Sequence, residues 1–430
     1  RLATDQEVLG SNPSRRTKIL TMNKSLLTER IFLLLFSLSI IGSRLFVFYF
    51  YKDLNLENEW ANLFHNLQIS GVIGFNVILD DNTVIQKFAE AGDKVLPSVW
   101  MPPFYLFFLH TVNFIIGNIF QLTNSIIIIQ ILLNLLSIYI FFQIVRKFLN
   151  RKATLYLTVI YAFFPALIFS SVQISSVSIQ IFLILCFLYF IPDNFSQKRK
   201  YSLIIFSIFS GMLILTRGEF FIFYIFTLFY FFIFKDQKIK NLISSIIITL
   251  LVLSPYLYRN YKNFNTVVLT KSFVYNLLKG NNKNFKVEGD VSIINQIREN
   301  IDIQANNYFE IKIDNIYKDE AIKYIKENPL TFVKNYFKKF FSFLIIDINS
   351  SNNNYYHLVH VVPKLIISIL ALISALIGLK RKSFFQYLSL YYFFNILLFS
   401  FFFILPRYSV ILIPIQLILI GLAFKVVRKE

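Results

Sequence analysis

The sequence predicts an all-α integral membrane protein with about ten transmembrane helices, additional interfacial helices and two large loops on the outer face. Three observations support this fold class. Of the 430 residues, 56% are hydrophobic and 18% are aromatic, which is too apolar for one soluble core. Apolar runs recur at close to the ~20 residues that cross a bilayer. Clusters of lysine and arginine separate these runs.

The candidate spans are stretches in which nearly every residue is apolar and charged residues are rare. They lie at about 30–51, 124–145, 153–172, 177–192, 201–216, 219–234, 241–258, 363–379, 384–405 and 408–424. Two further apolar segments, 103–120 and 336–348, would invert part of the topology if they crossed alone. We therefore interpret them as interfacial or re-entrant helices.

The formal net charge of +19 indicates membrane topology rather than nucleic-acid binding, because the basic residues sit between apolar runs. With about ten spans, every basic cluster falls in the cytoplasm. The clusters are Arg15, Arg16, Lys18, Lys24 and Arg30; Arg146, Lys147, Arg151 and Lys152; Lys198, Arg199 and Lys200; Lys235, Lys238 and Lys240; Lys380, Arg381 and Lys382; and Lys425, Arg428 and Lys429. The long connections 52–102 and about 259–362 then face outward. We expect the cytoplasmic (inner) membrane, with these loops on the periplasmic or extracellular side.

The ends of the chain and its single cysteine set further bounds. Gly10-Ser11-Asn12-Pro13 can be back-translated to a string that resembles the T-arm of a tRNA gene, so we expect residues 1–21 to be a non-native upstream extension and Met22 the start. The remaining units are a transmembrane module at 22–258, an outer loop at 259–362 and C-terminal helices at 363–430. Cys186, which lies in an apolar run, is the single cysteine of the chain, so an intramolecular disulfide is excluded.

The first outer loop begins with acids on an amphipathic helix, in the stretch LENEWANLFHNL at 56–67. Trp60, Phe64 and Leu67 share one helical face, and Glu57 joins that face while Glu59 points away from it. A first-turn acid is favoured by the helix dipole, which is sufficient to explain Glu59. An acid on the apolar stripe is costly without a partner or a task, so Glu57 is the stronger functional candidate. Asp53, just after the first span, is the third.

Short motifs follow one another along the chain in a fixed order. They are Leu56-Glu57-Asn58-Glu59-Trp60, Trp100-Met101-Pro102-Pro103-Phe104-Tyr105, the stretch from Gly211 to Arg217-Gly218-Glu219, Arg259-Asn260-Tyr261 with Gly280-Asn281-Asn282, and Pro406-Arg407-Tyr408. In order and spacing they resemble the membrane-embedded GT-C glycosyltransferases that use polyprenyl-phosphate sugars, the group of protein O-mannosyltransferases and lipid A aminoarabinose transferases. The resemblance covers nearly everything from Met22 onward. Where that family often has Asp-Glu-x-x-Tyr, Leu56 replaces the leading acid, so the base stays open among Glu57, Glu59 and Asp53.

The resemblance implies an inverting glycosyltransferase that moves a sugar from a polyprenyl-phosphate donor to an acceptor hydroxyl at the outer face. The resemblance leaves the acceptor open among a glycolipid such as lipopolysaccharide, a cell-envelope polysaccharide and a protein. Such transfer needs a base for the hydroxyl proton and cations for the departing phosphate. Arg217, Arg259 and Arg407, with Arg44 assisting, are the candidates for the phosphate. The substrate-binding candidates are Trp60, Asn260, Asn281, Asn282 and Tyr408.

Arginine alone can stabilise a lipid-phosphate leaving group, and the sequence contains no evident metal-ligand set, so we expect no metal and no other cofactor. Two other classes remain possible from the residues themselves. A transporter or flippase for a lipid-linked sugar would share the spans but should have charged or broken helices at the midplane. A noncatalytic scaffold would need neither the loop acids nor converging arginines. Each arginine could also extend to lipid headgroups at the end of a span.

Overall fold

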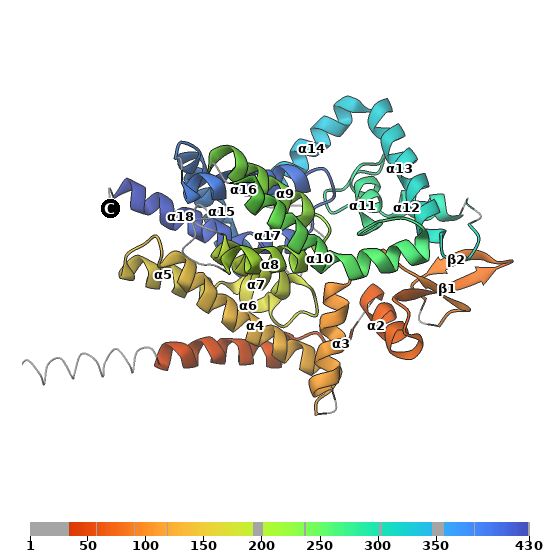
Figure 1. Cartoon of the computed structure of the whole chain (residues 1–430), viewed down its shortest axis with the longest axis horizontal. Coiled ribbons are helices and arrows are strands. Elements are labelled where there is room, and N and C mark those ends of the chain that lie inside the picture. The colour runs from red at the N-terminus through yellow and green to blue at the C-terminus, as the bar shows by residue number, and fades with distance from the viewer. Residues whose placement is uncertain are drawn as a thin grey trace, which may run out of the picture.

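The computed structural model describes residues 34–56, 58–89, 91–117, 119–191, 201–235, 238–299, 301, 303–345, 357–381 and 383–428. The extension expected at residues 1–21 and the candidate base Glu57 lie outside these residues. The described chain is mostly helical, with a bundle of apolar helices on one side and a smaller mixed module on the other (Figure 1).

Helices make up nearly all of the regular structure. They are the N-terminal helix Leu34–Tyr51, α2 (Asn58–Ser70), α3 (Phe104–Ile116), α4 (Leu122–Val145), α5 (Arg151–Ala162), α6 (Pro165–Ser170), α7 (Val177–Phe190), α8 (Ser202–Thr216), α9 (Phe220–Phe234), α10 (Ile239–Phe264), α11 (Ser272–Gly280), α12 (Ser292–Glu299), α13 (Phe309–Glu327), α14 (Pro329–Leu344), α15 (Leu358–Leu379), α16 (Phe384–Phe399), α17 (Pro406–Val410) and α18 (Ile413–Val427).

Within the described residues, 5 segments are helical, long and apolar enough to cross a membrane: the N-terminal helix, α4, α10, α15 and Pro406–Val427. Four other expected spans correspond to the shorter apolar helices α7, α8, α9 and α16. A multi-pass membrane protein is therefore confirmed, whereas the full number of spans stays a prediction. The interfacial placement expected for 103–120 and 336–348 also stays a prediction; the first contains α3 and the second overlaps α14.

The span expected at 153–172 is wrong as a single helix. Asn150 caps α5 by accepting a hydrogen bond from the backbone N–H of Ala153 at 2.9 Å. The chain then breaks at Phe163 and Phe164, and Pro165 begins α6. Proline has no N–H to continue the ladder of α5 but suits the first turn of a new helix.

The all-α expectation is wrong for the first outer loop, which contains a three-stranded antiparallel sheet. Strands β1 (Gly74–Asp80), β2 (Thr83–Lys87) and β3 (Lys94–Pro97) form it in the order β2-β1-β3. Asp80 pairs with Thr83, so Asp81 and Asn82 form a two-residue turn, and both have positive φ, at 43° and 65°. Aspartate and asparagine tolerate this conformation and favour such hairpin turns.

The two outer loops form one module with its own core. Val84 donates its backbone N–H to the carbonyl of Ile303 at 3.1 Å, and Ala305 donates to Asn82 at 2.8 Å, so the second loop borders the sheet of the first. The buried cluster between them draws on β1, β3, α11, α12 and α13. Its members are Phe75, Val77, Leu96, Leu278, Ile294, Ile303, Ala305, Phe309, Ile313, Tyr317 and Ala321.

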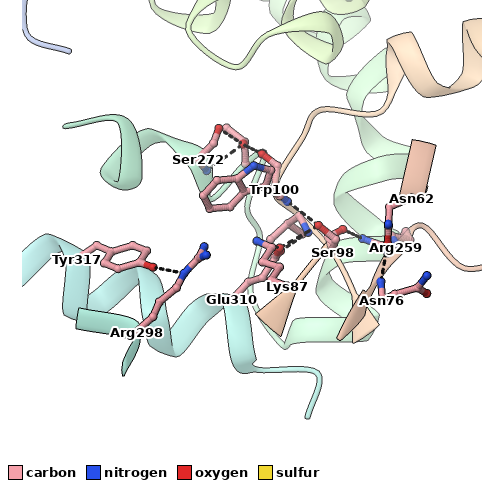
Figure 2. Close-up of polar contacts among 12 residues, drawn as sticks. Asn62, Asn76, Lys87, Ser98, Trp100, Arg259, Ser272, Arg298, Glu310 and Tyr317 are labelled. Carbon is pink, nitrogen blue, oxygen red and sulfur yellow. Dashed lines mark hydrogen bonds and ion pairs between the residues drawn. The ribbon is translucent and has the colours of Figure 1, made fainter. Parts of the chain in front are cut away.

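A buried ion pair joins the two loops beside this core. Lys87 at the end of β2 donates to Glu310 of α13 at 2.9 Å, and the two side chains are only 3% and 1% exposed. Glu310 also accepts from the hydroxyl of Ser98 at 3.0 Å and from the backbone N–H of Val99 at 2.6 Å. The Lys87 ammonium lies 3.8 Å from the ring centroid of Trp100 (Figure 2). One carboxylate therefore fixes both β2 and the segment after β3.

Helix α10 connects the module to the bundle. It runs for 26 residues with Pro255 inside it and continues past the expected span 241–258 to Phe264. Beyond Pro255, Arg259 donates to the carbonyl oxygens of Ser98 at 2.7 Å and Ile73 at 2.6 Å. The guanidinium of Arg259 therefore ties the sheet to α10 (Figure 2).

Removing one partner of the Lys87–Glu310 pair should destabilise the folded chain strongly. We expect Lys87→Met to lower the free energy of unfolding by about 3–5 kcal/mol at pH 7, because a buried carboxylate is left unpaired. The double variant K87M/E310Q should recover most of this loss, since glutamine can still accept from Val99. Equilibrium unfolding of the full chain in mixed micelles measures both values.

The control is the pair Lys286–Asp290, whose lysine side chain is 71% exposed. Lys286→Met should change the free energy of unfolding by less than about 1 kcal/mol. Equal losses for K87M and K286M would contradict the role assigned to the buried pair.

Candidate functional site

Residues from three distant segments meet around Lys279, near the end of α11. Burial lowers the pKa of Lys279, and the positive charge of Arg407 lowers it further. The negative charges of Glu59, Glu288 and Asp290 act in the opposite direction. The charges of an acid from the first loop and of an arginine from α17 therefore both act on this lysine of the second loop.

Tyr275 lies on the same helix as Lys279, one turn earlier. Its ring lies edge-to-face on Trp100, with the centroids 4.7 Å apart. Burial raises the pKa of Tyr275; Arg298 opposes this, whereas Tyr317, Glu59 and Tyr408 add to it. Glu59 and Tyr408, both sequence candidates, therefore face this same region.

The Gly280-Asn281-Asn282 motif fixes the position of Lys279. A Cβ on Gly280 would lie 2.6 Å from backbone atoms of Phe402 and Phe403, so only glycine allows this close approach. Asn281 donates to the carbonyls of Leu277 and Phe401, both at 2.8 Å. The motif thereby holds the end of α11 against the segment that leads into Arg407.

The side-chain amides of this motif make hydrogen bonds within the protein. Asn282 donates to the carbonyl oxygens of Leu278 and Lys279, both at 3.1 Å. Lys339 of α14 is fully buried and donates to Asn281 Oδ1 at 2.7 Å and to the Gly280 carbonyl at 3.2 Å. Burial lowers the pKa of Lys339 to about 7. A role for Asn281 and Asn282 in substrate binding stays a prediction.

Arg217 and Tyr408 are brought together at the outer end of the bundle. The guanidinium lies 4.4 Å from the ring centroid of Tyr408 and donates to Glu219 at 3.1 Å. Arg217 is thus a partly buried cation beside an aromatic ring.

The other candidates lie in different surroundings. Arg259 bonds to backbone carbonyls and to Asn260 Oδ1 at 2.8 Å, and the Asn260 amide donates to the Val268 carbonyl at 2.7 Å. Arg44 is 1% exposed and donates to Asn134 of α4 at 3.1 Å and to the carbonyl of Ala162 of α5 at 2.5 Å. These contacts place Arg44 within the bundle. Its role as a phosphate ligand, like that of Arg259, stays a prediction.

Asp53 and Trp60 are held at the junction of the first loop and the bundle. Asp53 Oδ2 accepts from the backbone N–H of Ile174 at 2.7 Å. The ring of Trp60 lies edge-to-face on Tyr105, with the centroids 4.8 Å apart. Both residues therefore lie where the first loop rests on α3 and the α6–α7 connection.

Residues 101–258 match the family model described as dolichyl-phosphate-mannose-protein mannosyltransferase. The matched segment begins at the end of the first outer loop and ends in α10. This segment, less than half of the chain, is therefore similar to that glycosyltransferase family. The match agrees with the resemblance of the motifs that lie inside it. None of the curated proteins matches the sequence significantly.

Two solved structures are similar to this chain. One is the crystal structure of ArnT from Cupriavidus metallidurans bound to undecaprenyl phosphate, with 11% identity, a TM-score of 0.42, and coverage of 93% of this chain and 78% of that chain. The other is ArnT from the same organism in the apo state, with 12% identity, a TM-score of 0.41, and coverage of 92% and 78%.

Sequence reasoning missed Lys279 and Tyr275 as members of this cluster. Lys279 immediately precedes the Gly-Asn-Asn motif, and that adjacency is the signal that could have identified it. The described residues hold no group of three or more His, Cys, Asp or Glu arranged to bind a metal ion.

The pH dependence of Lys279 reactivity tests whether the charges of Arg407 and Glu59 act on this lysine. Because its pKa is lowered, its neutral amine should appear at a lower pH than in an unfolded chain. Arg407→Gln should raise that pH, since a positive charge is removed, and Glu59→Gln should lower it further. Amine labelling across pH, followed by mass spectrometry, measures the midpoint.

The exposed Lys283, four residues further along the chain, serves as the internal control, and its labelling should be unchanged in both variants. Identical Lys279 midpoints in wild type, R407Q and E59Q would show that the three charges do not meet.

Proposed function

We propose that this glycosyltransferase moves a sugar from a polyprenyl-phosphate-linked donor to an acceptor hydroxyl at the outer face of the membrane, with inversion at the anomeric carbon. The observation that carries the proposal is the packing of the end of α11, which bears Lys279, against the segment that leads into Arg407. The charge of Glu59 also acts on Lys279. The family description supports the donor class, because dolichyl phosphate is a polyprenyl phosphate. The acceptor we propose is a cell-envelope glycan or glycolipid.

The cations supply what the leaving group requires. As the bond between the anomeric carbon and the phosphate oxygen breaks, negative charge develops on the lipid phosphate. Preorganised cations in a partly buried site stabilise this charge better than water does. We assign this role to Lys279 and Arg407. Arg217, which is partly buried, lies beside Tyr408, the residue that follows Arg407. The spent lipid phosphate then leaves.

A carboxylate acting as general base must take the proton of the acceptor hydroxyl while that oxygen attacks the anomeric carbon. Glu57, Glu59 and Asp53 are the three candidates. Glu59 is favoured among the described residues because its charge acts on Lys279, Tyr275 and Lys87. Asp53 accepts a backbone hydrogen bond from Ile174, which would hold a base in place equally well. We keep all three in the test.

The decisive measurement is release of free polyprenyl phosphate from labelled polyprenyl-phosphate sugars, in membranes that carry the chain at matched expression. We expect one of Glu57→Gln, Glu59→Gln and Asp53→Asn to abolish turnover, because only one carboxylate is the base. Lys279→Met should lower kcat/KM by about 10²–10³-fold, the usual effect of removing one charge-stabilising group. Lys283→Met is the matched control and should retain full activity.

Turnover that survives all three acid variants would remove general-base catalysis from the proposal. Movement of the intact lipid-linked sugar across vesicle membranes without release of lipid phosphate would instead indicate a transporter.

Activity should be independent of divalent metal ions, because lysine and arginine can neutralise the departing phosphate themselves. Lipid-phosphate release in the presence of a chelator should therefore equal release without it. Activity that disappears with the chelator and returns with a divalent ion would contradict this prediction.

A further inference from the structure

A cavity of about 350 Å³ opens at the outer end of the bundle, where the α8–α9 turn faces the second outer loop. Glu219 and Phe221 line it from the bundle, Thr270, Lys271 and Phe273 from the segment that begins α11, and Asp314 from α13. Its volume lies within the range of about 300–1,000 Å³ that small-molecule sites occupy. The cavity is thus built by segments that are far apart in the sequence.

Asp314 is the unusual group in this lining. Its side chain is 6% exposed, and Oδ2 accepts from Lys271 at 2.8 Å, whereas Oδ1 is buried without a hydrogen-bond partner. Burial raises the pKa of Asp314, although Lys271 acts to lower it. A buried carboxylate oxygen without a donor is costly, and the adjoining cavity is the space from which a donor could reach it.

The charges that border the cavity limit what it can hold. Its two carboxylates already face one cation each, Glu219 facing Arg217 at 3.1 Å and Asp314 facing Lys271 at 2.8 Å. A phosphate would be repelled by both acids. A lipid tail would leave the free oxygen of Asp314 without a donor. A hydroxyl group would supply that donor and add no charge.

The remaining walls suit a ring. Phe221 and Phe273 are each 42% exposed, so their aromatic faces are open to a ligand. The hydroxyls of Thr270 and Ser272 lie 2.9 Å apart beside them. Carboxylates, hydroxyls and open aromatic rings together match the alternating hydroxyl edges and apolar faces of a sugar.

We propose that this cavity binds a neutral sugar ring of the acceptor. That this sugar belongs to the acceptor rests on the proposed function, whereas the binding of a neutral sugar in the cavity does not. Ser272 at the cavity and Lys279 at the cation cluster begin and nearly end α11, which separates them by about 10 Å along the helix axis. A sugar held here thus lies within one or two rings of the reaction centre. This assignment makes the acceptor a carbohydrate rather than a peptide.

The test uses saturation-transfer NMR on the purified full chain in lipid nanodiscs, with methyl glycosides of glucose, galactose and mannose as probes. At least one glycoside should bind the wild type. Asp314→Asn should weaken its binding by about tenfold, because hydrogen bonds to a charged acceptor are about twice as strong as neutral ones. Asp319→Asn is the matched control, since Asp319 is exposed on the same helix.

Phe221→Ala keeps every charge of the cavity and is the alternative test variant if Asp314→Asn fails to fold. It should weaken glycoside binding, whereas Phe229→Ala, at a position 62% exposed on the same helix, should not. The cavity assignment is overturned if no glycoside binds the wild type, if putrescine binds in place of glycosides, or if the cavity variants bind as the controls do.

Measuring lipid-phosphate release on the same samples separates the two proposals. Glycoside binding without release of lipid phosphate would support sugar binding in the cavity and contradict the proposed reaction. Release of lipid phosphate without glycoside binding would support the reaction and contradict sugar binding in the cavity. If both hold, Asp314→Asn should lose transfer to a saccharide acceptor while it still releases lipid phosphate to water.

Discussion

The outer module depends on the ion pair between Lys87 and Glu310. It joins β2 to α13 across a sequence separation of 223 residues, and the same carboxylate receives the backbone of Val99. Burial lowers the pKa of Lys87 to about 8 even though Glu310 opposes the shift. The folded chain therefore releases this proton at a lower pH than the unfolded chain does. The pair specifies how the loops join rather than adding much net stability.

Because the first loop is fixed in this way, the second loop can be positioned against it. Lys271 donates its backbone N–H to the Val99 carbonyl at 2.9 Å, and Thr270 donates its hydroxyl to the Trp100 carbonyl at 2.7 Å. These bonds set where α11 begins, and Gly280 sets where it ends. Lys279 and the cavity thus take their positions from the same few contacts.

The sequence predicted the helical membrane bundle well because hydrophobic length is a local property. It did not predict the sheet, although Asp81-Asn82 lies between the β-branched runs of β1 and β2 and is a hairpin signal. The polar composition of the loop and the helical pattern at 56–67 favoured helix and irregular structure over strands. The partner of Lys87 could not be predicted, since nothing local connects it to Glu310. Arg259 had the pattern of a phosphate ligand, yet its guanidinium satisfies backbone carbonyls of the sheet edge.

Helix α10 sets the distance between the bundle and the outer module. It continues from the bundle to Arg259 and Phe264, so the position of the module relative to the bundle depends on the number of helical residues between them. One inserted residue would raise the module by about 1.5 Å and turn it by about 100°. The length of this helix is therefore constrained in a way that the lengths of the surface loops are not.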